Sequence, residues 1–353
     1  MTRKLVRAAL RRSQAQVHHV TPVAPGAARG RVAEVYRQVE RDFGMLAPPV
    51  TLHSPAPDVL AACWLMLRET LLVDGRAGRA AKETVAAAVS EGNRCPYCVD
   101  VHSATRDSLP SAAEGDALAG WARECAEQRR CPRDHPPFPR DQLAELAGVV
   151  VTFQYLNRMV TVFLADSPIP VEVPEVARGH ARRLLGRFMR PAERKRIRSG
   201  APLRLLPAAD LPGELSWSAR EHGVATALAR ACAAIGMAGQ RSVPAAVRAV
   251  VETELAAWAG EPPGPSRAWV ASAASSLAAE DRPAARLALL TAMAPYQVDG
   301  AVIEEFRDRN GSDRELVEVT AWASMAAARR VGAWLGPSTA REDDGSPAGH
   351  AGG

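Results

Sequence analysis

The sequence has few aromatic residues, few cysteines and no long uninterrupted apolar run. Aromatics are 5% of its 353 residues, and alternating Val, Ile and Thr runs are almost absent, which disfavours a β-sheet fold. Six cysteines in a chain this long do not form a disulfide scaffold. No apolar run reaches the about 18 residues of a membrane span, and the first residues lack the apolar core of a signal peptide. We therefore expect a cytoplasmic protein without a membrane segment.

The residues that are abundant favour helices. Alanine is very common, and apolar residues recur at three- and four-residue spacing. One helix is predicted to follow Asp58, as its N-cap, and to end at Gly75. The next is predicted to end at Gly92 in a left-handed C-cap conformation. A new helix then starts at Cys95-Pro96, because proline is tolerated at the first helical position. The predicted fold class is all-α.

Composition divides the chain into five predicted segments, and a short repeat relates two of them. CPYCVDVH at 95–102 and APYQVDGA at 294–301 share Pro, Tyr, Val and Asp, and each follows an alanine-rich helix. We interpret this as an internal duplication whose second copy has lost both cysteines and the histidine. The segments are a basic N-terminal segment (1–29), a first helical domain (30–165), a basic Pro-rich connector (166–215), a degenerate second helical domain (216–336) and a disordered tail (337–353).

The connector contains the strongest basic run. Nine of the 21 residues at 178–198 are Arg or Lys. Such a run can contact nucleic acid or an anionic membrane, but it is also typical of a solvated helix face. No aromatic residues are interleaved with it and no helix-turn-helix pattern accompanies it, so nucleic acid is disfavoured as a partner.

Three residues at the predicted helix start carry reactive groups. Cys98 falls in the first turn, where free backbone N–H groups and the helix dipole favour a thiolate. His102 lies four residues later, on the same helix face. Cys95 and Cys98 are spaced so that they can close into a disulfide, which makes them candidates for thiol redox chemistry. Glu83, on the preceding helix, is placed to face His102 if that helix folds back, and so to orient the imidazole or relay a proton.

Other readings of the cysteines remain open. The pair can be two buried structural thiols, or two of the ligands of a zinc site with His102. A fourth zinc ligand would have to come from Cys125, Cys131 or His135, which are irregularly spaced. A c-type haem is excluded, because its motif needs histidine directly after the second cysteine.

Three further side chains have a structural reading. Cys63 and Cys232 stand in apolar, alanine-rich surroundings and are predicted to be inert core thiols. Tyr97, between the two cysteines, is predicted to pack under the helix start rather than to donate a hydrogen bond into the site.

A glutamate twelve positions before the first cysteine of a C-x-x-C pair, with a histidine four positions after the second, resembles the pattern of the AhpD-like, carboxymuconolactone decarboxylase superfamily of helical proteins. Glu83, Cys95, Cys98 and His102 match this pattern. The likeness covers about 30–165 well and 216–336 faintly. Well-studied peroxidases of the family carry a histidine where this chain has Tyr97, and the decarboxylase branch generally lacks the cysteine pair.

The resemblance implies a thiol peroxidase or disulfide reductase that acts on alkyl hydroperoxides. Cys98 would become a sulfenic acid, Cys95 would resolve it to a disulfide, and His102 with Glu83 would relay protons. No cofactor is implied beyond this redox-active disulfide. The expected partners are a hydroperoxide, an external thiol reductant protein and further copies of the chain in a homo-oligomer. The alternative is a redox-sensing or binding module that uses the same disulfide as a switch, without turnover.

Overall fold

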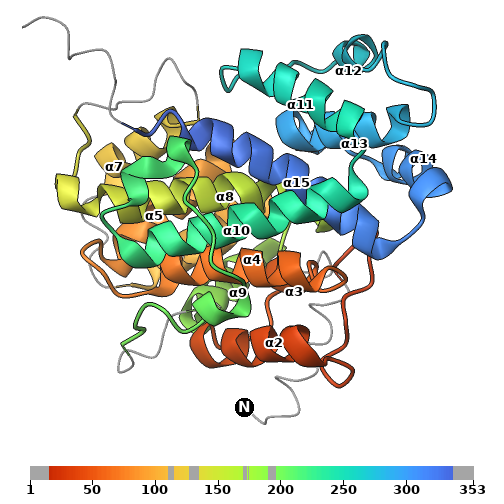
Figure 1. Cartoon of the computed structure of the whole chain (residues 1–353). Helices are drawn as coiled ribbons and strands as arrows, with labels where there is room; N and C mark the ends of the chain where they lie inside the picture. The colour runs from red at the N-terminus through yellow and green to blue at the C-terminus, as the bar shows by residue number, and fades with distance from the viewer. Residues whose placement is uncertain are drawn as a thin grey trace, which may run out of the picture.

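The fold is all-α, as the composition predicts. The computed structural model describes residues 16–109, 115–126, 135–169, 173, 175–189 and 196–336. Within these ranges the regular elements are helices (Figure 1). The one β contact among them is an isolated bridge between Val17 and Leu164. The predicted disordered tail (337–353) and the first half of the predicted N-terminal segment lie outside the described residues.

The first half of the chain is built around one central helix. α8 (Leu143–Phe163) is apolar on all sides, and nearly all of its residues are buried. The stretch Arg140–Phe163 is long and apolar enough to cross a membrane, but 94% of its most apolar window is buried inside the protein. Burial by neighbouring helices accounts for such an apolar core helix without a membrane. The helices around it are α2 (Gly30–Asp42), α3 (Pro48–Thr51), α4 (Pro57–Leu67), α5 (Arg79–Gly92), α6 (Pro96–Asp107) and α7 (Gly115–Glu124).

Two predicted ends of the second helix are wrong. The N-cap of α4 is Ala56, and Asp58 already lies inside the first turn. After α4 the helix widens into a π-helical turn, Arg68–Leu72, and ends before Gly75. Position 75 is occupied by glycine for a reason other than ending the helix: a Cβ there would lie 2.1 Å from the Glu145 carboxylate. Its lack of a side chain makes room for that buried acid.

The second half repeats the order of the long helices. It consists of α10 (His222–Ser242), α11 (Ala245–Ala257), α12 (Ala268–Ala273), α13 (Arg282–Met293), the 3-10 turn η5 (Pro295–Gln297), α14 (Gly300–Asn310) and α15 (Asp313–Gly332). α13 packs on α15 as α5 packs on α8. Where the first half continues from its cysteine motif directly into α6, the second half has only the short η5 before α14.

Like helices meet across the boundary between the halves. α8 packs along α15, and α4 packs along α10 (Figure 1). Close approach depends on small residues: a Cβ at Gly148 of α8 would lie 2.9 Å from Val224 of α10, and one at Gly332 of α15 would lie 3.2 Å from Val151 of α8. Two related bundles joined about a two-fold axis would produce this pairing. The duplication itself stays a prediction.

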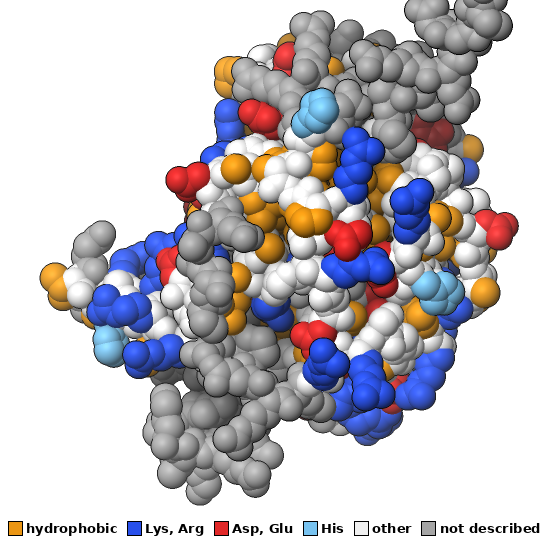
Figure 2. Space-filling view, turned by 90° about the vertical axis from the view of Figure 1, so that its left-hand side faces the viewer, with side chains coloured by type: hydrophobic (Ala, Val, Ile, Leu, Met, Phe, Trp, Pro, Cys, Tyr) orange, Lys and Arg blue, Asp and Glu red, His pale blue; other side chains and the backbone are white. Residues whose placement is uncertain are grey.

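The predicted connector contains structure that reaches the cysteine motif. Its helix α9 (Glu175–Met189) packs against α6, and Ser108 donates a hydrogen bond of 3.1 Å to the Gly186 carbonyl. After α9 come two 3-10 turns, η3 (Leu203–Leu205) and η4 (Gly213–Ser218). On the face shown in Figure 2, basic side chains are interspersed with acidic and apolar ones.

Candidate active site

The cysteine motif begins where α5 turns back into α6. α5 ends at Gly92 as predicted, but Gly92 is not in the left-handed conformation. That conformation falls instead on Arg94, with φ 54°, directly before the first cysteine. Cys95 is the N-cap of α6, and Pro96 takes the first helical position as expected. The left-handed residue therefore lies two positions later than predicted and is not a glycine, which is uncommon for this region of backbone space.

Cys95 and Cys98 are free thiols and are both buried. Burial acts to raise the pKa of Cys95, but hydrogen bonds to its sulfur outweigh this and lower it. They come first from the Cys98 thiol and backbone N–H, and also from the Asn157 side chain. The pKa of Cys98 is raised, by burial and by its bond to the negative Cys95 sulfur. The prediction that the helix start favours a thiolate at Cys98 is therefore wrong: burial outweighs the helix terminus, and Cys95 is the more acidic of the two thiols.

The Glu83–His102 contact predicted from the sequence is present. His102 Nδ1 lies 2.7 Å from Glu83 Oε2, and both side chains are buried. The other carboxylate oxygen accepts from Arg79 Nε at 2.8 Å and pairs with its Nη2 at 2.7 Å. Burial acts to raise the pKa of Glu83, but the charges of Arg79 and His102 outweigh it, so the pKa is lowered. Glu83 is therefore an ionised carboxylate fixed between two partners.

The edge of a phenyl ring fixes the other side of the histidine. The His102 and Phe153 rings meet edge to face, with centroids 4.6 Å apart. No hydrogen bond joins His102 to either thiol in the part of the chain that the structure describes. A proton that passes between the Glu83–His102 pair and the sulfurs must therefore be carried by a substrate oxygen or a water molecule.

A polar layer that the sequence reading missed surrounds the thiols. Asn157, in the apolar core helix α8, accepts from Asn93 Nδ2 at 2.9 Å and donates to Ser90 Oγ at 3.0 Å. Its side chain also acts to lower the pKa of both cysteines. An asparagine in the middle of an apolar helix is itself a signal, because a buried amide needs partners. The i, i+4 spacing of Arg79 and Glu83 is a second signal that was available.

The remaining sequence predictions concern side chains away from the chemistry. Cys63 and Cys232 are buried as predicted, and burial raises the pKa of each, that of Cys232 to about 12. Tyr97 is also buried, and burial and the nearby cysteine charges raise its pKa.

The described residues contain no group of three or more His, Cys, Asp or Glu side chains arranged to hold a metal ion. Among the candidate fourth ligands, Cys131 lies outside the described residues. The arrangement is instead suited to thiol redox chemistry, because it combines an activated thiol, a second thiol in hydrogen-bond contact and a carboxylate–imidazole pair.

Comparison with known proteins agrees with this reading. No protein-family model matches the chain. A curated protein of Mycobacterium tuberculosis, named alkyl hydroperoxide reductase, is 36% identical over 335 residues. The match covers 91% of this chain and 95% of the relative, so it includes both halves. Together with the helical fold and the Glu83…Cys95-x-x-Cys98…His102 site, this likeness establishes that the chain belongs to the AhpD-like family.

Proposed function

We propose that the protein reduces organic hydroperoxides through a Cys98 sulfenic acid and a Cys95–Cys98 disulfide. The observation that carries the proposal is the buried Glu83–His102 pair at 2.7 Å, on the two helices that flank the coupled thiols. The relative named alkyl hydroperoxide reductase supports the same class of reaction.

The reaction proceeds in two covalent steps. The Cys98 proton first moves to Cys95 along their hydrogen bond, so that Cys98 becomes the thiolate. Its sulfur attacks the terminal oxygen of the hydroperoxide; an S–O bond forms, the O–O bond breaks, and an alkoxide leaves. Two electrons pass from sulfur to the peroxide, which leaves Cys98 as a sulfenic acid. Cys95 then attacks that sulfur, so an S–S bond forms and hydroxide departs.

Glu83 and His102 supply and collect the protons. The alkoxide takes the proton held between His102 and Glu83 and leaves as an alcohol. The same pair then accepts the Cys95 proton and delivers it to the departing hydroxide, which becomes water. An external dithiol reduces the disulfide and resets the site.

Mass spectrometry of the reduced protein tests the proposal. After one equivalent of cumene hydroperoxide, we expect a loss of two hydrogens confined to the Cys95–Cys98 peptide and reversed by dithiothreitol. Cys98→Ser should abolish peroxide consumption, Cys95→Ser should trap a sulfenic acid on Cys98, and the control Cys63→Ser should behave like the unmodified protein.

Other outcomes would overturn the proposal in specific ways. A sulfenic acid on Cys95 in the Cys98→Ser variant would show that Cys95 attacks the hydroperoxide and Cys98 resolves the intermediate, in keeping with the lower pKa of Cys95. Consumption that stops after one equivalent in excess dithiol would indicate a redox switch. No mass change at all would rule out a redox centre.

A further inference from the structure

A cavity of about 490 Å³ lies behind the cysteine loop, between the two halves of the chain. One wall is the loop before Cys95, with Asn93 and Arg94. The opposite wall belongs to the second half and includes Trp258 and the degenerate motif residue Pro295. Neither thiol lines it. The cavity is therefore separate from the site of the proposed chemistry.

The buried charge of this cavity is Arg158, on α8. Its side chain is 4% exposed, and burial lowers its pKa to about 10. It donates to the Ala292 carbonyl at 2.8 Å and to Gln154 O and Oε1 at 2.6 and 2.7 Å. Its guanidinium also lies over the Trp258 ring, 5.7 Å from the centroid. Among the residues described, no carboxylate pairs with it, although buried cations are normally paired.

The side chain of Gln154, beside Arg158, has a donor without a partner. The Oε1 atom of Gln154 is occupied by Arg158, which fixes the orientation of the amide. Its Nε2 is buried and has no acceptor among the described residues. Gln154 is 1% exposed and lines the same cavity. A guanidinium and an adjacent free amide N–H are donors suited to one carboxylate group.

The rim of the cavity adds further positive charge. Arg94 is exposed, and its guanidinium lies 5.7 Å from the centroid of Tyr296 on the opposite wall. Arg123 is held by Glu91 at 3.0 Å, and the acid among the lining residues, Glu124, is exposed. Glu124 therefore lies toward solvent, whereas Arg158 and Gln154 lie at the buried floor of the cavity.

We propose that this cavity binds a small organic acid. The carboxylate would accept from Arg158 and Gln154, and an aliphatic or aromatic body would lie against Trp258 and Pro295. The inference goes beyond the proposed function, because it needs neither thiol. An occupant would still adjoin Asn93, whose amide donates to Asn157 in the layer around the sulfurs.

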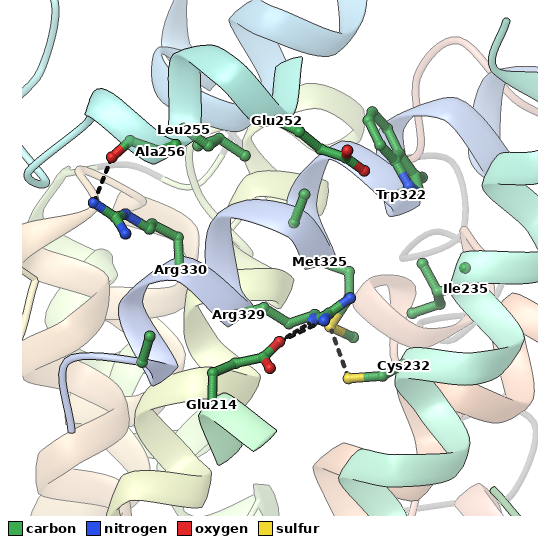
Figure 3. A pocket seen from close by; sticks show the side chains of 13 residues that line it. Glu214, Cys232, Ile235, Glu252, Leu255, Ala256, Trp322, Met325, Arg329 and Arg330 are labelled. Carbon is green, nitrogen blue, oxygen red and sulfur yellow. Dashed lines mark hydrogen bonds and ion pairs between the residues drawn. The ribbon is translucent and has the colours of Figure 1, made fainter. Parts of the chain in front are cut away.

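A second cavity of about 340 Å³ serves as the comparison (Figure 3). It lies among second-half elements, and its two arginines are already engaged: Arg329 pairs with Glu214, and Arg330 donates to the Ala256 carbonyl at 2.7 Å. Among the described side chains that line it, this cavity has no buried donor without a partner comparable with Gln154 Nε2.

Calorimetric titration of the reduced full-length protein with octanoate tests the proposal. One equivalent of octanoate should bind. Octanol, which lacks the carboxylate, and inorganic phosphate, which lacks the apolar chain, should each bind about 10- to 100-fold more weakly. Gly120→Phe should block binding, since Gly120 lines the cavity and its Cβ position has nothing within 4 Å. Gly236→Phe, which fills the comparison cavity from an equally open glycine, should bind octanoate normally.

Four results would overturn the inference. Octanol binding as tightly as octanoate would show an apolar cavity without recognition of an acid. Phosphate binding equally well would show a site for bare anions. Unchanged octanoate binding in Gly120→Phe, or no heat from octanoate at all, would remove the site. None of these results depends on peroxide turnover, so the proposed function stands or falls separately.

Discussion

Replacing Glu83 with glutamine should slow the reaction with hydroperoxide in a protein that remains folded. The carboxylate is the buried partner of His102 at 2.7 Å, and glutamine keeps its shape but not its charge. A positioned acid–base group contributes roughly 100- to 10,000-fold to a rate. The rate of Cys98 oxidation by the hydroperoxide, followed by rapid-quench mass spectrometry, should therefore decrease by a factor within that range.

The same change should cost stability in a pH-dependent way. Removing one partner of a buried ion pair costs about 3–5 kcal/mol, and because the Arg79 side chain is 17% exposed we expect about 2–3 kcal/mol at pH 7. The pKa of Glu83 is lowered in the folded protein. Its contribution is therefore complete above the unfolded pKa of about 4.3 and is lost as the pH falls through the lower folded value. Urea unfolding should show the two proteins converging in stability on acidification.

Glu318→Gln is the matched control. Glu318 is also buried, accepts from Arg241 and Arg314 at 2.8 and 2.9 Å, and has a lowered pKa, but it lies in the half that lacks the C-x-x-C motif. It should lose comparable stability and react with peroxide normally. The relay argument would be refuted by an unchanged oxidation rate in Glu83→Gln, or by equal slowing in Glu318→Gln.

Two further substitutions test the surroundings of the site. Asn157→Leu should raise the pKa of Cys95, because it removes a hydrogen bond to the sulfur. Alkylation of Cys95 by iodoacetamide at pH 7 should then be roughly 2- to 10-fold slower. An unchanged alkylation rate would show that Asn157 does not stabilise the Cys95 thiolate. Gly186→Ala should lower the melting temperature, because the new Cβ would lie 2.2 Å from the Ala104 carbonyl oxygen, at a cost of about 1–3 kcal/mol. The control Gly179→Ala, in open space on the same helix, should be neutral or stabilising, and equal melting of both variants would show that α9 is not held against α6.

The parts of the site that sequence reasoning found are the local ones. Cys98 and His102 share a helix face because they are four residues apart, and the GN break after α5 folds Glu83 back toward them. Pro96 marked the start of α6 correctly. Each of these follows from spacing along a single helix or across one turn.

What the sequence did not reveal depends on contacts between distant segments. Asn157 reaches the thiols from another helix, and no spacing rule connects position 157 with position 95. The left-handed residue was expected at glycine and occurs at Arg94, because the geometry of the turn overrides local preference. The docking of α9 on α6 likewise depends on Gly186, which sits in what reads as a linker.

Because both walls of the organic-acid cavity belong to one polypeptide, each of its side chains occurs once. In a homodimer, the two subunits present the same residues on opposite sides of the two-fold axis. An arginine close to that axis would therefore face the same arginine of the partner subunit and be repelled by it. Here Arg158 meets Trp258 instead. Two bundles within one chain thus permit a surface that is polar on one side and aromatic on the other, an asymmetry that identical subunits cannot provide at their axis.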